Sequence, residues 1–307
     1  MTTRLDMQEQ RVTSDSGEWT ISRLIEWTIN HLAEADIDPP RLAAELLLAH
    51  AIGCQRIELY TRFDAAPSAE ELSTFRANVI QAAKHHPIAY LIGKKEFYSL
   101  EFEVTPAVLI PRPATEVLVE HVIGYCKPLE RERIDILDLG TGSGCIGVTL
   151  CRHLENAFVV GSDISEEALE VAGRNAEKLG LQERFRTVRA DGFDLPADVV
   201  PTNGFHVLAS NPPYVAFADA ESLEPAVRDH EPHIALFGDR DGLEFYRRIA
   251  ASAGKILSPA GSIFVEIGYD QHDHVIEILT AGGYRHVDSW RDYDSGHLRV
   301  IHFDRTE

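Results

Sequence analysis

The sequence predicts an α/β protein whose doubly wound, Rossmann-like sheet is preceded by a small helical domain and a hairpin linker. Two observations support this fold class. Residues 19–86 carry apolar side chains at helical spacing. From residue 111 onward, strand-like apolar runs alternate with amphipathic stretches, which is typical of a parallel sheet with helices on both faces. The length of 307 residues suits two domains of about 100–200 residues each.

Three helices are expected in residues 19–86. Apolar residues recur at helical spacing from residue 20, and a second helix opens at the Pro39-Pro40 pair and ends at Gly53. Ser68 and Glu71 form a capping-box pattern that begins the third helix, which the next proline ends. Residues 87–110 instead hold short alternating runs that favour a hairpin.

Residues 111–307 are assigned to the doubly wound domain. Strands are predicted at IDILDLG, FVVGSD, FRTVRA, FHVLASN, SIFVEIG and LRVIHF. Helices are predicted at TGSGCIGVTLCRHL, SEEALEVAGRNAEKLG, GLEFYRRIAASAGKIL and HDHVIEILTAGG. This alternation is how a parallel sheet with crossover helices is encoded.

Composition and charge exclude several classes of protein. Hydrophobic residues at 44% and charged residues at 25% match globular averages, which excludes wholesale disorder and rod-like folds. The formal net charge of −20 disfavours naked DNA or RNA, because an acidic surface repels phosphates. We therefore expect a protein or small-molecule substrate and no direct nucleic-acid partner.

The cysteines and the N-terminal segment predict a location. Cys54, Cys126, Cys145 and Cys151 contain no C-x-x-C pair, so reduced thiols are expected. Residues 1–18 are polar, which predicts a disordered tail rather than a signal peptide, and no run of about 18 apolar residues indicates a membrane span. A cytoplasmic protein that contacts no membrane is expected.

A glycine-rich turn, Asp138-Leu-Gly140-Thr-Gly142-Ser-Gly144, joins a predicted strand to a predicted helix. Glycines let the backbone pass close to a ligand. The stretch from Gly142 to Gly147 also fits G-x-G-x-x-G, and Asp163 follows Gly142 by 21 residues, where a ribose-binding acid is expected. NAD and S-adenosylmethionine are therefore not separated by this turn alone.

The acid that precedes the first glycine favours S-adenosylmethionine. The pattern D-x-G-x-G-x-G resembles the first motif of methyltransferases that use this cofactor, which has no pyrophosphate. In this interpretation Asp138 orients the loop or accepts a hydrogen bond from the methionine ammonium, and Asp163 accepts from both ribose hydroxyls. Asp191, at the end of the next strand, accepts from the adenine amino group, with Gly192 and Phe193 lining the base.

Asn211-Pro212-Pro213-Tyr214 follows the fourth predicted strand, at the carboxyl edge where doubly wound sheets bind ligands. Two prolines fix the backbone and leave carbonyl groups free to accept hydrogen bonds. The Asn211 side-chain oxygen and the Pro212 carbonyl would hold both N–H bonds of an acceptor nitrogen, and Tyr214 would cover the planar group. Asn211, Pro212 and Tyr214 are the predicted catalytic residues.

Four segments together resemble the release-factor glutamine methyltransferase family, over nearly the whole chain from residue 19. They are FYSLEFEVTPAVLIPRPATEVLVE at 97–120, DLGTGSG at 138–144, NPPY at 211–214 and EPHIALFG at 231–238. The resemblance implies a seven-stranded methyltransferase domain after the helical domain and hairpin. It also implies methyl transfer from S-adenosylmethionine to the side-chain amide nitrogen (N5) of the glutamine in the Gly-Gly-Gln loop of peptide chain release factors, which leaves S-adenosylhomocysteine.

The resemblance also assigns residues by position. It implies a cofactor site formed by Gly140, Thr141, Gly142, Ser143, Gly144, Asp163, Asp191, Gly192 and Asn211, and a glutamine site formed by Asn211, Pro212, Pro213 and Tyr214. Two positions depart from the family pattern: Ala114 stands where many relatives have an acid, and Gly192 stands where some have an aromatic residue.

Other functions are weighed beside this one. Amino nitrogens of adenine or cytosine in nucleic acid are rival acceptors, which the net charge disfavours. An NAD oxidoreductase or a silent binding module is a third possibility, and no acid or base for hydride transfer is recognisable. The helical domain is expected to dock the protein substrate. The histidines at 230, 233, 272 and 274 are assigned to solvated or structural roles, so no metal is expected.

Overall fold

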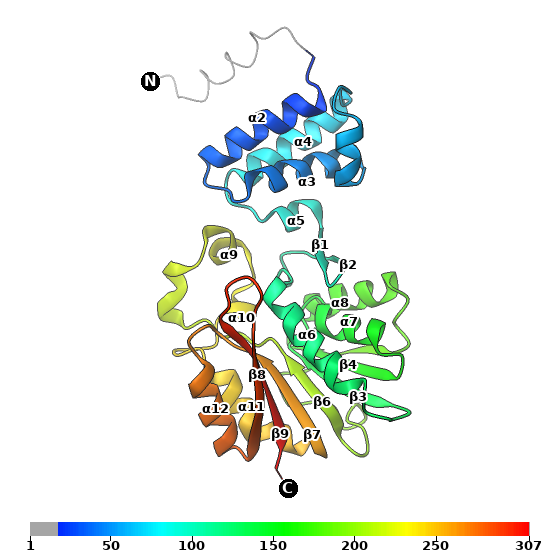
Figure 1. Cartoon of the computed structure of the whole chain (residues 1–307), viewed down its shortest axis with the longest axis vertical. Helices are drawn as coiled ribbons and strands as arrows, with labels where there is room; N and C mark the ends of the chain where they lie inside the picture. The colour runs from blue at the N-terminus through cyan, green and yellow to red at the C-terminus, as the bar shows by residue number, and fades with distance from the viewer. Residues whose placement is uncertain (1–17, 307) are drawn as a thin grey trace. The chain divides into compact units, whose positions relative to one another are not determined.

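The computed structural model describes residues 18–306, so the prediction for residues 1–18 lies outside this range apart from Glu18. The chain divides into two compact units after Ile92, and each unit has its own apolar core. In Figure 1 the first unit runs from blue to cyan and the second continues to red. The hairpin segment belongs to the second unit.

The first unit is helical. Its helices are α2 (Ile21–Glu34), α3 (Pro40–Ile52), the 3-10 helix η1 (Arg56–Thr61), α4 (Ala69–Ala82) and the short α5 (Ile88–Ile92). The three predicted helices are confirmed as α2, α3 and α4. Ser68 caps α4, because its hydroxyl accepts from the Glu71 N–H at 3.2 Å while the Glu71 carboxylate accepts from the Ser68 N–H at 2.6 Å.

A two-stranded hairpin opens the second unit. Strands β1 (Lys94–Phe97) and β2 (Leu100–Glu103) pair antiparallel. Tyr98 and Ser99 form the turn with φ of +49° and +60°, the geometry that tight hairpin turns require. The predicted hairpin is confirmed within residues 94–103, whereas residues 88–92 form α5 instead of extended chain.

The central sheet has seven strands in the order β5-β4-β3-β6-β7-β9-β8. The first five are parallel, whereas β9 is antiparallel to β7 and to β8. This topology confirms the predicted fold class. The strands are β3 (Ile134–Leu139), β4 (Ala157–Asp163), β5 (Phe185–Arg189), β6 (Phe205–Ser210), β7 (Leu257–Glu266), β8 (Tyr284–Arg291) and β9 (Leu298–Arg305).

Helices cover both faces of the sheet (Figure 1). On one face lie α6 (Pro113–Cys126), α7 (Cys145–His153) and α8 (Glu166–Lys178), together with the hairpin. On the other lie α11 (Glu244–Ser252) and α12 (His272–Ala281). In β3, Ile136 packs in the core on the α7 face of the sheet and Leu137 in the core on the α11 face, as expected where successive side chains point to opposite faces.

Besides the short helices, α6 and β8 were not predicted. Helix α6 begins with Pro113 in its first turn, a position that proline favours, whereas the sequence predicted no element between residue 111 and the strand IDILDLG. Strand β8 is an edge strand whose side chains are mostly exposed, so it lacks the apolar run by which buried strands are recognised. The short helices η2 (Phe217–Ser222), α9 (Pro225–His230), α10 (His233–Leu236) and η3 (Ala253–Lys255) complete the unit.

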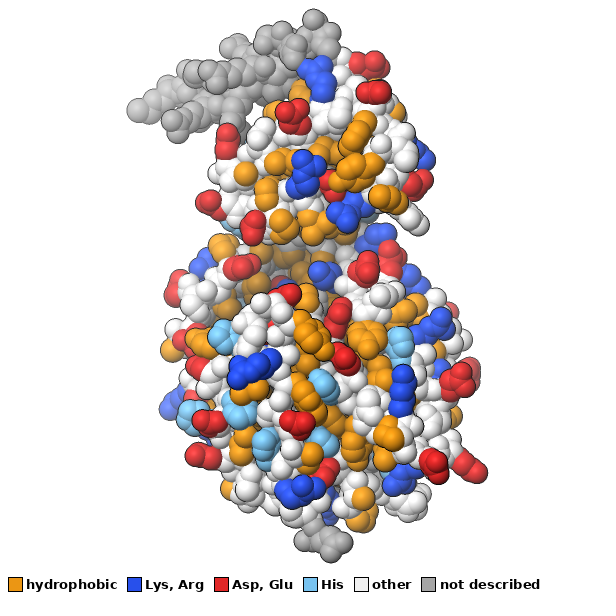
Figure 2. All heavy atoms as spheres, viewed as in Figure 1, with side chains coloured by type: hydrophobic (Ala, Val, Ile, Leu, Met, Phe, Trp, Pro, Cys, Tyr) orange, Lys and Arg blue, Asp and Glu red, His pale blue; other side chains and the backbone are white. Residues whose placement is uncertain are grey.

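Three further features concern the surface charges, the cysteines and the helix lengths. Acidic and basic side chains are interspersed on the face drawn in Figure 2. All four cysteines are free thiols. Between residues 18 and 306, no helix is both long enough and apolar enough to span a bilayer.

Candidate active site

A cavity of about 370 Å³ opens at the carboxyl edge of the parallel strands. This volume lies within the range of about 300–1,000 Å³ typical of small-molecule sites. Its lining includes the residues that follow β3, β4, β5 and β6. Because these strands are neighbours in the sheet, four sequence motifs that lie far apart along the chain meet at one edge.

The glycine turn after β3 already uses most of its N–H groups. Gly140, Gly142 and Gly144 have φ of +74°, +53° and +79°, a region that residues with a Cβ rarely adopt. The N–H groups of these three glycines and of Thr141 donate to acceptors within the protein at 2.8–2.9 Å. The turn therefore offers the cavity fewer donors than a phosphate-binding loop does.

Asp138 is completely buried behind this turn. Its Oδ2 accepts from the Thr141 hydroxyl at 2.6 Å and from the Gly147 N–H at 2.9 Å. Its Oδ1 has no hydrogen-bond partner among the described residues. Burial raises the pKa of the Asp138 carboxyl to about 7, against the opposing effect of these two bonds. Asp138 was expected either to orient the glycine loop or to accept from the methionine ammonium, and these two contacts correspond to the first role.

Asp163 ends β4 and lines the cavity. Its Oδ2 accepts from the Gly142 N–H at 2.9 Å, and its Oδ1 accepts from the Ser165 N–H at 3.0 Å. These bonds fix the carboxylate between the glycine turn and the start of α8. Each oxygen has a further lone pair, so the group retains the capacity to accept from a vicinal diol.

Asp191 and Gly192 also line the cavity, just after β5. The Asp191 carboxylate is not free: its Oδ1 lies 2.6 Å from Nη2 of Arg248, a residue of α11. Phe193, expected beside the base, does not line this cavity and packs against the core on the α11 face. Arg248 does line it.

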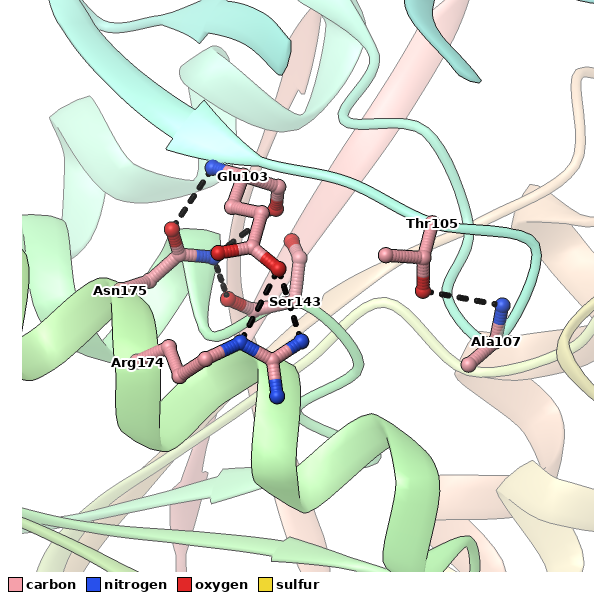
Figure 3. Close-up of polar contacts among 6 residues, drawn as sticks. All are labelled: Glu103, Thr105, Ala107, Ser143, Arg174 and Asn175. Carbon is pink, nitrogen blue, oxygen red and sulfur yellow. Dashed lines mark hydrogen bonds and ion pairs between the residues drawn. The ribbon is translucent and has the colours of Figure 1, made fainter. Parts of the chain in front are cut away.

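A buried asparagine on α8 fixes the back of the glycine turn (Figure 3). Asn175 Oδ1 accepts from the Glu103 N–H at 2.7 Å, and Nδ2 donates to the Glu103 and Ser143 carbonyls at 3.0 and 2.9 Å. Next to it, Arg174 pairs with the Glu103 carboxylate at the surface. The Ser143 carbonyl is therefore held by a residue of the supporting helix.

The Asn-Pro-Pro-Tyr segment follows β6. Asn211 and Pro213 line the cavity, whereas Pro212 is buried and Tyr214 is partly buried outside the lining. Asn211 Nδ2 donates to Thr115 Oγ1 at 3.1 Å, which leaves the amide oxygen as the half of this side chain available to a substrate N–H. Burial raises the pKa of the Tyr214 phenol, so this group remains a neutral hydroxyl.

Two glycines let the chain from 236 to 242 pack directly on this segment. A Cβ at Gly238 would lie 2.4 Å from the Pro213 carbonyl oxygen, and one at Gly242 would lie 2.1 Å from that of Tyr214. The Gln271 side chain donates to the same Tyr214 carbonyl at 2.9 Å. The backbone of the motif is thus held from outside the cavity.

The segment Pro-Arg-Pro-Ala-Thr-Glu at 111–116 contributes side chains to three separate contacts. Arg112 pairs with the buried Glu231 at 2.5 Å. Thr115 meets Asn211, and Glu116 accepts from the Tyr98 N–H at 2.8 Å. The segment therefore connects the hairpin, the Asn-Pro-Pro-Tyr turn and the EPHIALFG stretch.

A second buried carboxyl lies behind the Asn-Pro-Pro-Tyr turn, where Glu266 ends β7. Burial raises the pKa of Glu266 to about 7, and interactions with the Thr115 and Tyr214 side chains oppose this shift. No group of three or more His, Cys, Asp or Glu side chains within residues 18–306 is arranged to hold a metal ion.

A seven-stranded sheet with a glycine turn after β3 and acids after β4 and β5 defines the class of S-adenosylmethionine-dependent methyltransferases. The family model described as a methyltransferase domain matches residues 130–265, and the model described as the PrmC N-terminal domain matches residues 23–93. The catalytic domain of human Mettl16, solved with an MAT2A 3'UTR hairpin, superposes with a TM-score of 0.54 at 16% identity, over 76% of this chain and 81% of that one. That likeness shows the fold.

Curated relatives identify the family. The release factor glutamine methyltransferase of Geobacter sulfurreducens is 41% identical, over 87% of this chain and 90% of its own length. That of Rhodopirellula baltica is 38% identical, over 94% and 97%. This chain belongs to the release factor glutamine methyltransferase family.

Sequence reasoning missed the partners that hold the site residues. Thr115, Arg248 and Glu231 reach the cavity region from elements distant in sequence. The Pro-Arg-Pro-Ala-Thr-Glu motif contains Thr115, but nothing in the motif predicts that Thr115 contacts Asn211. No pattern around Arg248 distinguishes it from the arginine before it.

Proposed function

We propose that this chain transfers a methyl group from S-adenosylmethionine to the side-chain amide nitrogen (N5) of the glutamine in the Gly-Gly-Gln loop of peptide chain release factors. Family membership supports the reaction class, and one observation of the site supports it most. The sheet order places the residues after β6, β3, β4 and β5 side by side along one cavity. A long ligand on that edge therefore meets Asn211 at one end and Asp191 at the other.

The donors and acceptors of the cavity fit S-adenosylmethionine better than a dinucleotide. This cofactor carries a sulfonium and an ammonium, both cationic, and no phosphate. In the glycine turn, the N–H groups of Gly140, Thr141, Gly142 and Gly144 already donate to acceptors within the protein. The buried Asp138 carboxyl lies behind this turn. We assign the cofactor to the turn from Gly140 to Gly144, including Ser143, and to the carboxylates of Asp163 and Asp191, with Gly192 beside them.

The acceptor glutamine is assigned to the Asn-Pro-Pro-Tyr turn. The Asn211 amide oxygen and the Pro212 carbonyl would accept the two N–H bonds of the substrate amide, with Pro213 and Tyr214 completing the site. An amide nitrogen is a poor nucleophile, because its lone pair is delocalised into the carbonyl. Two acceptors that hold both hydrogens favour a pyramidal nitrogen and so stabilise the transition state more than the bound substrate.

When bound, S-adenosylmethionine supplies an electrophilic methyl group. Asn211 and Pro212 aim the nitrogen at that methyl, and no general base is needed before attack, because the proton leaves after methylation. The neutral phenol of Tyr214 places no negative charge against the nitrogen. The cofactor leaves as S-adenosylhomocysteine.

The remaining proposals concern the helical unit and the place of the reaction. We assign the docking of the release factor to the helical unit, which matches the PrmC N-terminal domain model, because none of its described residues lines the cavity. Methylation in the cytoplasm follows from the site of translation. Deletion of this unit, with the second unit still folded by circular dichroism, should lower turnover with a whole release factor and spare cofactor binding; normal turnover would contradict the docking role.

The test of the function is labelled methyl transfer. The protein is incubated with labelled S-adenosylmethionine and, separately, a recombinant release factor, DNA and RNA. The label is mapped by mass spectrometry of peptides from the release factor and of nucleosides from the nucleic acids. We expect one methyl group on the glutamine of the Gly-Gly-Gln loop. Asn211→Ala should lower the rate about a hundredfold to a thousandfold, the usual effect of removing one positioned group. Label on adenine or cytosine, or on another residue, would refute the proposal.

A further inference from the structure

The strand order gives the cavity a direction. Moving outward from β6 through β3 and β4 to β5, the side chains that follow each strand are Asn211, the glycine turn, Asp163 and Asp191. If the reacting methyl lies near Asn211 and the ribose near Asp163, as the proposed function requires, the adenine lies at the β5 end. The residues that close that end then determine how the base is held.

Arg248 belongs to α11, which packs on the opposite face of the sheet from α7, the helix that follows the glycine turn. Its side chain extends to the β5 end of the cavity. Its Nη2 lies 2.6 Å from Asp191 Oδ1 and 3.2 Å from the Asp191 carbonyl oxygen. Its guanidinium carbon lies 5.6 Å from the centre of the Phe245 ring. Arg248, Phe245 and Asp191 all line the cavity.

Gly192 makes room for this arginine. A Cβ at position 192 would lie 2.4 Å from Arg248 Nη2 and 3.0 Å from its guanidinium carbon. Gly192 also has φ of +62°, which strains other residues. The guanidinium therefore occupies the volume that a side chain of residue 192 would take at the mouth of the cavity.

The ion pair itself contributes little to the stability of the fold. The Arg248 and Asp191 side chains are 38% and 58% exposed, and exposed pairs are worth little in water. A planar guanidinium that is held at a cavity rim is instead well suited to stack on an aromatic ring. It also keeps the Asp191 carboxylate from repelling electron-rich atoms of a base.

We infer that Arg248 is a cofactor-binding residue of this chain: its guanidinium covers the adenine of S-adenosylmethionine while it orients Asp191 toward the exocyclic amino group of the base. This inference rests on the proposed function. The methionine carboxylate is the other group that an arginine would attract, but Arg248 lies past Asp163 on the side of β5, away from the glycine turn and Asn211.

Two ligands and three variants test the inference. S-adenosylhomocysteine carries adenine, ribose and the amino acid, whereas 5'-methylthioadenosine lacks the amino acid. Calorimetry compares the wild type with Arg248→Ala, Arg248→Lys and the matched control Arg247→Ala. Arg247 precedes Arg248 on the same helix and pairs with Asp241 and Glu244. Its own side chain does not line the cavity, although that of Glu244 does.

We expect Arg248→Ala to weaken both ligands by the same factor, about tenfold, the size of a partly desolvated cation–π contact. Arg248→Lys should recover little of it, because an ammonium has no planar face, and Arg247→Ala should bind as the wild type. The melting temperatures of the two alanine variants should agree, which shows that the loss is not one of folding.

Unchanged affinity of Arg248→Ala for both ligands would overturn the inference while leaving the proposed function intact. A loss confined to S-adenosylhomocysteine would also overturn it, since the arginine would then serve the amino-acid end. A wild-type protein that binds neither ligand would instead refute the proposed function.

Discussion

Thr115→Val should slow methyl transfer without weakening the cofactor site. The Thr115 side chain is 2% exposed, and its Oγ1 accepts the hydrogen bond from Asn211 Nδ2 at 3.1 Å. Valine keeps the shape and removes the acceptor. The Asn211 amide then loses the contact that distinguishes its nitrogen from its oxygen, so the orientation with the oxygen toward the substrate is no longer favoured.

The size of the effect follows from the bond that is lost. A hydrogen bond of this kind contributes about 0.5–1.5 kcal/mol net. Its loss therefore lowers the population ratio of the correct to the flipped Asn211 amide by up to about tenfold. With that preference gone the two orientations are about equally populated, so we expect kcat to fall by about twofold, well short of the loss expected for Asn211→Ala. The flip also leaves a buried N–H facing the substrate N–H groups, which opposes binding of the amide.

The assay separates orientation from folding. Turnover of a recombinant release factor is measured with Thr115→Val and with Thr115→Ser, which keeps the hydroxyl, and the affinity for S-adenosylhomocysteine is measured by calorimetry. Thr115→Ser should retain most of kcat, and both variants should bind the cofactor product as the wild type does. Equal kcat for the serine and valine variants would refute the reasoning, because only one of them keeps the acceptor.

Three further predictions use the same site. Asp163→Ala should weaken S-adenosylmethionine by about 1.5–3 kcal/mol, the range for a hydrogen bond to a charged group; calorimetry that shows unchanged affinity would contradict its ribose role. Burial raises the pKa of Asp138 from 3.8 to about 7, so the folded state holds this proton more tightly than the unfolded chain, and ionisation costs the ligand-free protein stability as pH rises from about 4 to above 7. Asp138→Asn removes that cost, and its stability relative to the wild type, measured by urea unfolding, should increase from pH 5 to pH 8; a constant difference would show that Asp138 does not titrate in this range. Gly242→Ala places a Cβ 2.1 Å from the Tyr214 carbonyl oxygen at φ of +71°, so it should lower the melting temperature and the turnover together. Gly173→Ala, inside α8 with open space around the glycine, should leave the turnover unchanged and raise the melting temperature slightly, because a helix favours alanine over glycine.

The elements that the sequence predicts best are those whose burial repeats with a clear period. The helices α2, α3 and α4 show their apolar spacing and, for α4, the Ser68 cap. Strand β8 was missed because an antiparallel edge strand buries few side chains. Helix α6 was missed for a different reason: Pro113 stands in its first turn, and a proline in that place marks the start of a helix as readily as the end of a loop.

The candidate site divides in the same way. The residues expected at the strand ends do meet at one cavity, because parallel strands end at a common edge. Their partners could not be predicted. Contacts such as Thr115 with Asn211 and Arg248 with Asp191 join residues 96 and 57 positions apart, and only the packing of α6 and α11 on the sheet decides which side chains meet.

The role of the third glycine in G-x-G-x-x-G shows how the structure resolves the choice of cofactor that the motif leaves open. In a dinucleotide site the helix N-terminus after the turn receives a phosphate. Here the Gly147 N–H, in the first turn of α7, donates to Asp138 Oδ2. A Cβ at Gly147 would lie 2.9 Å from that oxygen and 2.5 Å from the Phe185 ring, so the glycine allows the carboxyl to approach the helix. An internal carboxyl group therefore takes the place of an external phosphate, and a pyrophosphate would meet both the Asp138 carboxyl and a turn whose N–H groups are already bonded. The acid two residues before the first glycine is thus the part of the motif that argues against NAD, and it does so through a contact nine residues away.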